Sequence, residues 1–197
     1  MKSSSLVIIA ILALLFFMGC NRYNGMVNNS EAVTAKWANV ENLYQRRSDL
    51  IPNLVATVKQ AASTEQAILT QVVEARAKAT QIKIDPSTAT PEQLAEFQRR
   101  QGELGSALGR LLMISEQYPQ LQSIQGFTDL RAELAGSENR LAVARQDFNS
   151  VVLAYNTSIK RFPANIFAGM FGFHERAYFQ AEAGSKANPN VGNLFNN

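Results

Sequence analysis

Residues 127–155 read FTDLRAELAGSENRLAVARQDFNSVVLAY, and apolar side chains recur in this stretch every three or four positions. The apolar positions are Phe127, Leu130, Leu134, Leu141, Ala144, Phe148, Val151 and Tyr155, with Ser137 filling the one gap. This spacing places the side chains along one face of a helix, in a heptad rhythm like that of a coiled coil. The stretch therefore predicts a helix from about residue 127 to 161, ended by Pro163 and buried along one stripe.

Two earlier stretches carry the same kind of pattern. From residue 30 to about 82, apolar residues share one helical face, and Pro52 is expected to break or kink that span. Residues 90–93 (TPEQ) combine a capping Thr, a Pro at the first helical position and a Gln, so they predict the start of another helix, ending before Pro119. With a loop at 83–90, the sequence predicts an all-α fold, a long antiparallel up-and-down four-helix bundle.

Composition argues against several classes of function. The net charge of +3 is spread over 197 residues without a block of like charges, which argues against a nucleic-acid partner. The sequence has one histidine, His174, and carries no nucleophile, phosphate-loop or zinc motif. We therefore expect no enzyme, no cofactor and no metal site. Cys20 is the only cysteine, so no intrachain disulfide can form.

The N-terminus predicts a membrane address. Residues 6–18 are apolar and end at Gly19-Cys20. This run has the length of a signal peptide and is short of the roughly 20 residues that a spanning helix needs. The thiol at its end predicts a bacterial lipoprotein signal in residues 1–19, with Cys20 as the lipid attachment site and the bundle outside the cytoplasm. The alternative is an uncleaved membrane anchor.

The rest of the chain divides by composition. Residues 20–29 are polar and turn-prone and predict a tether, residues 30–179 the helical-bundle domain, and residues 180–197 a disordered tail. The aromatic residues of 162–179 predict either a short helix that closes the bundle or a patch that faces a membrane or a partner. Gly102, Gly105 and Gly109 predict close approach of a neighbouring helix backbone, with a hinge or an oligomer contact as alternatives.

A set of polar residues interrupts or flanks the apolar stripes. Burying a charge is costly, so such residues are expected to be paired, peripheral or functional. One interpretation is a network of ion pairs and amide hydrogen bonds that fixes helix register, and the other is a polar groove for a peptide or a partner helix. The candidate interaction residues are Arg46, Arg47, Asp49 and Asn53 on the first helix and Glu138, Asn139 and Arg140 on the last.

Three blocks resemble the LemA family of bacterial proteins. They are YQRRSDLIPNLV at 44–55, SENRLAVAR at 137–145, and Phe162-Pro163 before FGF at 171–173. The resemblance implies an up-and-down helical bundle tethered to the membrane by its N-terminus, without an established enzymatic activity. It also implies an envelope partner, possibly a TPM-domain protein. Together these observations predict a membrane-tethered binding or scaffold protein of the cell envelope. The alternative is a small-ligand or peptide-binding protein, or an enzyme, that uses the polar groove.

Overall fold

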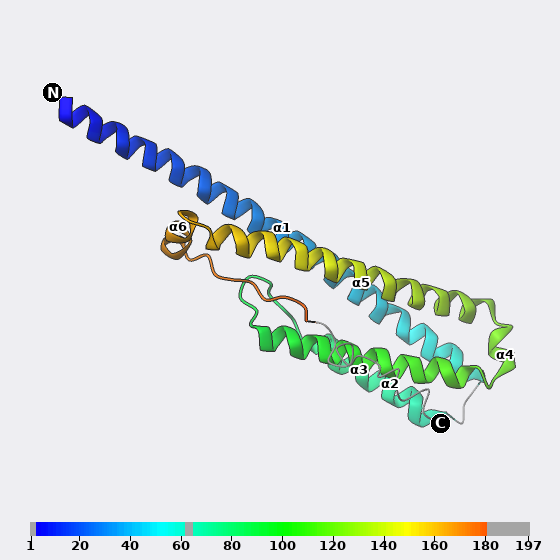
Figure 1. Cartoon of the computed structure of the whole chain (residues 1–197). Coiled ribbons are helices and arrows are strands. Elements are labelled where there is room, and N and C mark those ends of the chain that lie inside the picture. The colour runs from blue at the N-terminus through cyan, green and yellow to red at the C-terminus, as the bar shows by residue number, and fades with distance from the viewer. Residues whose placement is uncertain (1–2, 62–64, 181–197) are drawn as a thin grey trace, which may run out of the picture.

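A computed structural model describes residues 3–61 and 65–180 of the chain. The secondary structure within these residues is helical throughout, which confirms the predicted all-α bundle. The bundle is formed by α1 (Ser3–Ala61), α2 (Gln66–Gln81), α3 (Pro91–Ser115) and α5 (Gln125–Lys160), and successive helices run in opposite directions (Figure 1). Two short helices, α4 (Pro119–Gln122) and α6 (Ala164–Phe171), lie at opposite ends of it.

The first helix differs from its prediction in two places. It runs without interruption through residues 21–29, where a turn-prone spacer was expected, and it continues past Pro52 to Ala61. Residues 21–29 stay helical because tertiary contacts override composition: Met26 is buried in the core, and the Tyr23 ring lies edge-on to Phe171 with 5.0 Å between ring centroids. The boundary between the first two helices, expected at Pro52, therefore lies later in the chain, and α2 begins only at Gln66.

Pro52 leaves a carbonyl without its usual helical partner, and another helix supplies one. Proline has no N–H, so the carbonyl four residues earlier, that of Ser48, loses its intrahelical hydrogen bond. The Arg76 side chain of α2 donates its Nε–H to this carbonyl at 2.9 Å. A long-range contact thus satisfies the buried oxygen, and α1 continues as a helix across the proline.

The start of α3 is as predicted, whereas its end lies earlier. The Thr90 hydroxyl accepts from the Gln93 N–H at 3.2 Å, and the Gln93 side chain accepts from the Thr90 N–H at 2.9 Å, which completes the capping box. The helix ends at Ser115, so Tyr118 lies outside it, half-buried. The Tyr118 hydroxyl donates to Glu65 at 2.9 Å. This carboxylate, which precedes the apolar stripe of α2, therefore has a polar partner.

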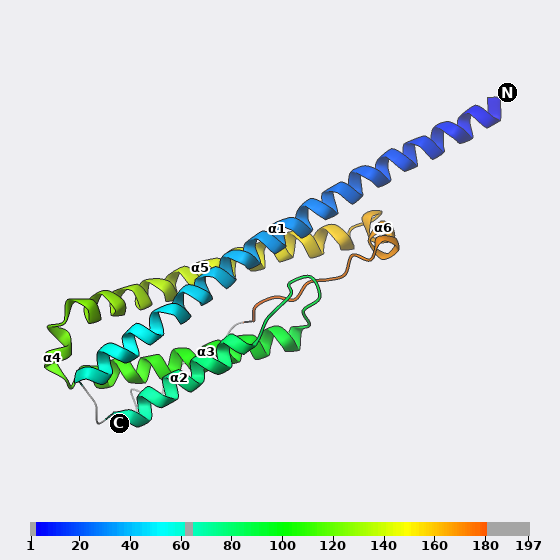
Figure 2. The same cartoon turned by 180° about the vertical axis from the view of Figure 1, so that it is seen from behind.

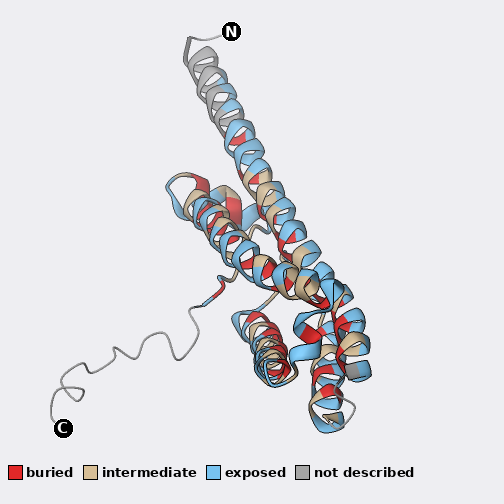
Figure 3. Ribbon diagram, turned by 90° about the vertical axis from the view of Figure 1, so that its right-hand side faces the viewer, coloured by how far each residue is buried: buried red, intermediate tan, exposed pale blue. Residues whose placement is uncertain are grey.

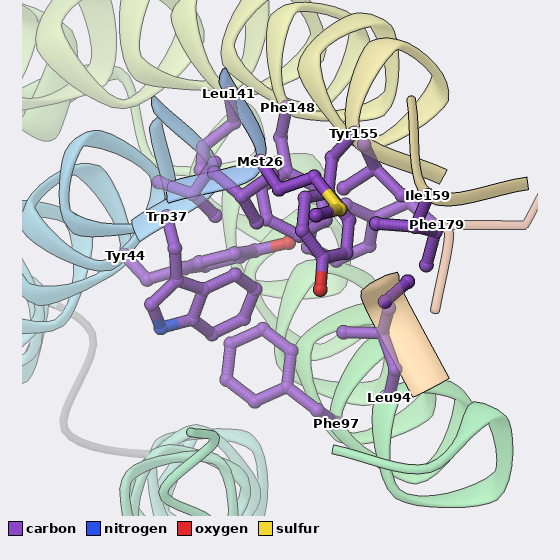
Figure 4. Packing of buried hydrophobic residues seen from close by; sticks show 14 residues of the cluster. Met26, Trp37, Tyr44, Leu94, Phe97, Leu141, Phe148, Tyr155, Ile159 and Phe179 are labelled. Atoms are coloured by element: carbon purple, nitrogen blue, oxygen red, sulfur yellow. The ribbon is translucent and has the colours of Figure 1, made fainter. Parts of the chain in front are cut away.

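The core is divided into two clusters of buried residues along the bundle. Figure 3 shows the buried positions, in red, spread along the helices. The half of the bundle next to α6 holds an aromatic cluster, and the half next to α4 holds an aliphatic cluster. The aromatic cluster contains Trp37, Tyr44, Phe97, Phe148, Tyr155 and Phe179 with smaller apolar residues around them (Figure 4). The aliphatic cluster is built mainly from Ile51, Leu54, Val58, Leu69, Val72, Leu104, Leu108, Leu111, Leu121 and Leu134, with Phe127.

The C-terminal part of the described chain closes the aromatic half. After α6 the chain turns at Gly172, whose positive φ of 73° suits glycine, and continues in extended conformation. This extended segment, residues 173–180, is called the strap below. It passes from α6 to the beginning of α3 (Figure 2). The predicted disordered tail lies, except for Gln180, outside the described residues.

Candidate binding groove between α3 and α5

A layer of buried polar side chains separates the two core clusters. It contains Arg47 and Ser48 on α1, Gln101 on α3 and Ser137 on α5, and these four residues are called the polar layer. On each of the three helices the layer lies between a residue of the aromatic cluster and one of the aliphatic cluster, as it does between Tyr44 and Ile51 on α1. Buried polar groups at one level of a bundle fix the register of its helices.

Arg47 is the charged member of the polar layer. Its side chain is only 8% exposed and makes an ion pair with Glu138 of α5 at 2.9 Å. A Cβ atom built on Gly105 of α3 would lie 3.0 Å from Arg47 Nη2, so the glycine leaves room for the guanidinium. The predicted close approach at Gly105 is thus made by the Arg47 side chain. At Gly102 and Gly109 a Cβ would meet nothing within 4 Å, so the prediction of a neighbouring helix backbone is wrong there.

Four of the candidate interaction residues take part in two neighbouring groups of ion pairs, one on Glu133 and one on Glu138, which are together called the ion-pair network. Arg46 pairs with Glu133 at 2.9 Å, and Arg140 pairs with the same carboxylate at 2.7 Å. Arg47 and Arg145 both pair with Glu138, at 2.9 and 3.3 Å. Glu133 was not singled out from the sequence, although it lies one turn before Ser137 on the same helix and is the shared acceptor of two arginines.

The other three candidates lie outside this network. Asp49 is exposed on α1 and accepts a hydrogen bond from Gln45 at 2.8 Å within the same helix. Asn53 and Asn139 are also exposed, and the Asn53 carbonyl accepts from the Thr57 hydroxyl. The structure therefore does not bring Asp49, Asn53 and Asn139 into one site with Arg47.

A cleft opens between α3 and α5, with α1 as its floor. Close backbone packing joins α1 to α5 and α2 to α3, whereas α3 and α5 approach each other less closely. The cleft has a volume of about 370 Å³. Its lining is Tyr44 and Arg47 on α1, Gln98, Gln101, Gly102, Gly105 and Ser106 on α3, and Glu138 and Arg145 on α5.

The strap lies in the same groove, directly beyond the cleft. Asn156 donates to the carbonyl of Arg176 and accepts from its N–H, both at 2.9 Å. Asn149 makes the same pair of hydrogen bonds with Phe179, and Gln98 with Gln180. Three side-chain amides thus each bind both backbone polar groups of one strap residue, and one of them, Gln98, also lines the cleft.

Two strap side chains anchor the segment. The Phe179 ring is buried, stacks on Trp37 with 5.8 Å between ring centroids and meets Phe148 edge-on at 5.4 Å. The guanidinium of Arg176 lies 5.2 Å from the Tyr155 ring centroid and donates to the Pro86 carbonyl at 2.8 Å. The strap is therefore bound as an extended peptide, through its backbone and one aromatic anchor. The backbone groups that Asn149 and Asn156 bind carry no recognisable sequence pattern, so the sequence does not predict this contact.

A smaller cavity lies on the other side of Tyr44. It measures about 110 Å³ and is lined by Trp37, Ser48 and Gln101 among others. The Trp37 indole N–H and the Ser48 hydroxyl are buried, and neither has a hydrogen-bond partner within the described residues. Figure 4 shows the indole nitrogen on the side of the ring that faces away from Phe148 and Tyr155. A small polar cavity of this kind accommodates ordered water.

Clear electrostatic perturbations occur at the loop before α3 and on its first turns. The pKa of Asp85 is lowered, first by the hydrogen bond from the Ser87 hydroxyl and then by that from the Ser87 N–H. The Glu96 pKa is lowered chiefly by the hydrogen bond from Arg99. Because these carboxyls are solvated, the shifts report local turn and helix geometry. Nothing in them points to acid–base chemistry.

Two further features are absent from the described residues. No group of three or more His, Cys, Asp or Glu side chains is placed to hold a metal ion in the part of the chain that the structure describes. Within the same residues, no helix has a stretch that is long and apolar enough to cross a membrane. Cys20, the predicted lipid attachment site, is exposed on α1.

Fold and groove together define a helical-bundle protein whose polar groove holds an extended segment. The model of the LemA family matches residues 36–192, and the chain belongs to this family. Two relatives named magnetosome protein MamQ, from Paramagnetospirillum magneticum, are each 31% identical over 195 residues, covering 89% of this chain and 72% of theirs. MamQ from Magnetospirillum gryphiswaldense is also 31% identical, over 87% of this chain and 70% of its own.

Proposed function

We propose that this chain is a membrane-tethered scaffold protein of the bacterial cell envelope, which holds an extended segment of a partner protein in the α3–α5 groove without catalysing a reaction. The observation that carries the proposal is the strap. One part of the groove already holds an extended peptide through Gln98, Asn149 and Asn156, and the adjoining part is an open cleft.

The chemistry of the groove favours an extended segment over a helix. An extended chain leaves its N–H and C=O groups without intrachain partners, and a side-chain amide can bind one of each. In a helix the backbone N–H and C=O groups are already hydrogen-bonded to each other, so they could not pair with the side-chain amides of the groove. The cleft adds Gln101, Ser106 and the Arg47–Glu138 pair as polar contacts for such a segment.

The tether rests on the N-terminal sequence. The apolar residues 6–18 and Gly19-Cys20 support a lipid anchor on Cys20 or an uncleaved anchor, with the bundle outside the cytoplasm in the first case. Intact mass of protein purified from membranes, beside a Cys20→Ser variant, distinguishes them. Loss of residues 1–19 with addition of acyl chains is expected for the lipoprotein, and a full-length mass in both proteins would make residues 1–20 the anchor.

Site-specific photo-crosslinking in cells tests the partner role. A photoreactive amino acid replaces Ser106, which is exposed at the cleft, or Ser150, which is exposed on α5 and does not line it. We expect position 106, and not 150, to label one contiguous segment of one envelope protein. A TPM-domain protein is the first candidate, because the family resemblance implies one.

A binding measurement then decides whether the cleft is the site. A synthetic peptide of the labelled segment should bind the purified full chain, and Ser106→Trp, which fills the cleft, should weaken binding at least tenfold. The matched control Ser150→Trp should leave it unchanged. Equal labelling from both positions, or binding that is indifferent to Ser106→Trp, would contradict the proposal.

A further inference from the structure

The short helix α6 buries two alanines, packs Phe167 partly against the aromatic cluster and exposes its other large apolar residues. Ala164 and Ala168 are buried, whereas Ile166, Met170 and Phe171 are at least half exposed, and Phe162 just before the helix is 80% exposed. A helix that merely closed a bundle would turn its large apolar side chains inward. The exposed side chains Phe162, Ile166, Met170 and Phe171 are called the apolar end patch below.

The apolar end patch lies beside the base of the N-terminal apolar run. A Cβ on Gly19 would lie 3.2 Å from the Phe167 ring of α6, and the Tyr23 ring contacts both Phe171 and Phe173. Residues 6–18 precede this contact directly, and the N-terminal part of α1 projects beyond α6 (Figures 1 and 3). A bilayer that receives either this run or an acyl chain on Cys20 therefore comes next to α6.

Two arginines flank the apolar end patch. Arg22 of α1 and Arg161 at the end of α5 are exposed and line a hollow of about 460 Å³, together with Asn21, Asn29, Ser158 and Phe162. Within the described residues neither arginine has a carboxylate partner, and Glu175, an acidic residue of the adjoining strap, is paired with Lys160 at 2.7 Å. Apolar side chains bordered by arginine match the interfacial region of a bilayer with anionic lipids.

We propose that the end of the bundle that carries α6 rests on the membrane surface, with Phe162, Ile166 and Met170 in the lipid interface and Arg22 and Arg161 on lipid phosphates. The inference rests on the tether of the proposed function and adds a second contact that fixes how the bundle stands on the membrane.

The test compares two exposed methionines at opposite ends of the bundle. Met170 lies on α6, and Met113 lies near the end of α3 beside α4; they are 72% and 67% exposed. Met170→Cys and Met113→Cys are made in the full chain purified from membranes, with Cys20 retained so that an acyl anchor can form, and are labelled with an environment-sensitive fluorophore. The chain with neither substitution measures any label that reaches Cys20. Each protein is reconstituted in phosphatidylcholine vesicles with about a third phosphatidylglycerol, and part of the lipid is brominated in the acyl chain to act as a quencher.

We expect a blue-shifted emission and severalfold stronger quenching at position 170 than at 113. Arg22→Glu with Arg161→Glu should reduce the quenching at 170 at least twofold in anionic vesicles and little in neutral ones. Arg110→Glu, an exposed arginine on α3, is the matched charge control and should change neither.

Three results would overturn the inference. If the full chain floats with vesicles but positions 170 and 113 are quenched equally, the tether stands and the docking of α6 is wrong. If the chain does not float with vesicles, the tether and the docking both fail. If emission at 170 shifts only with protein concentration and not with lipid, the apolar end patch is a contact between copies of this chain.

Discussion

The aromatic and aliphatic halves of the bundle are built on similar apolar periodicities, yet they are closed in different ways. In the aliphatic half four helices pack side chain on side chain around leucine, valine and isoleucine. In the aromatic half the strap covers the core from the α3–α5 side, with Phe179 as the filling side chain, and Ile82 and Ile84 in the loop after α2 pack on the same cluster. The difference shows that helical periodicity specifies which faces are buried but not what covers them.

The largest effect is expected from removing the strap's anchor. Phe179→Ala should destabilise the fold by about 3–5 kcal/mol, because a buried aromatic ring is replaced by a cavity. Urea unfolding followed by the fluorescence of Trp37, the only tryptophan and the ring that stacks on Phe179, measures it directly. Tyr178→Ala, next to it and largely outside the core, should cost no more than about 0.5 kcal/mol. Equal effects would mean that the strap does not close the aromatic half.

A second prediction concerns the polar layer between the halves. Arg76→Ala should lower the free energy of unfolding by about 1–3 kcal/mol. Pro52 has no N–H to offer the buried Ser48 carbonyl, and the substitution removes the side-chain donor that replaces it. In a Pro52→Ala background the new N–H supplies that donor, so the same Arg76→Ala change should cost less than about 1 kcal/mol. A double-mutant cycle from denaturant unfolding measures the coupling. Strict additivity would show that Arg76 does not compensate for the proline.

The three glycines of α3 should respond differently to alanine. Gly102→Ala and Gly109→Ala should each stabilise the protein by up to about 1 kcal/mol, because alanine favours helix and the space is open. Gly105→Ala should gain less or destabilise, because its Cβ would press on Arg47. The melting temperatures of the three variants test this prediction. An equal change in melting temperature for all three would show that Gly105 is not needed to make room for the Arg47 side chain.

The smallest effect is expected at the loop that Arg176 contacts. The Asp85 pKa lies below its ordinary value of 3.8, mainly because of the Ser87 hydroxyl. Its contribution to stability is therefore complete above the unfolded-state pKa and is lost as the pH falls through the lower folded-state pKa. Asp85→Asn should lower stability slightly at neutral pH, where the contribution of the carboxylate is complete, and should flatten the acid limb of the stability curve, so that its difference from the parent chain vanishes at low pH. An unchanged slope of stability against pH below 4 would contradict the assignment.

The sequence predicted the elements that depend on local patterns and missed those that depend on distant partners. The heptad of α5 and the capping box at Thr90 are local, and both were located correctly. The strap has no periodicity and is recognised mainly through its backbone, so its sequence gives no sign of where it binds. Pro52 was expected to break or kink the helix, yet α1 continues across it. The sequence could not show this, because the compensating donor, Arg76, lies 24 positions away on another helix.

The candidate site was predicted in the same uneven way. Arg47 drew attention because a charge stood where an apolar residue was expected, and that signal led to a buried ion pair. Asp49 and Asn53 were included for their closeness in sequence to Arg47. On a helix, neighbours in sequence point in different directions, so only part of that block reaches the cleft.

The continuity of α1 has a mechanical consequence. A turn at residues 21–29 would have let the bundle swivel on the proposed N-terminal anchor, but one 59-residue helix joins residues 6–18 to the bundle without a break. At a rise of about 1.5 Å per residue, Arg47 stands roughly 44 Å along the helix from Met18. In the proposed tethered arrangement, tilting the helix at its base moves the cleft through a proportionate arc and changes its height above the membrane. The proposed partner segment would have to reach that height, so spacing along α1 should matter as much as the residues of the cleft.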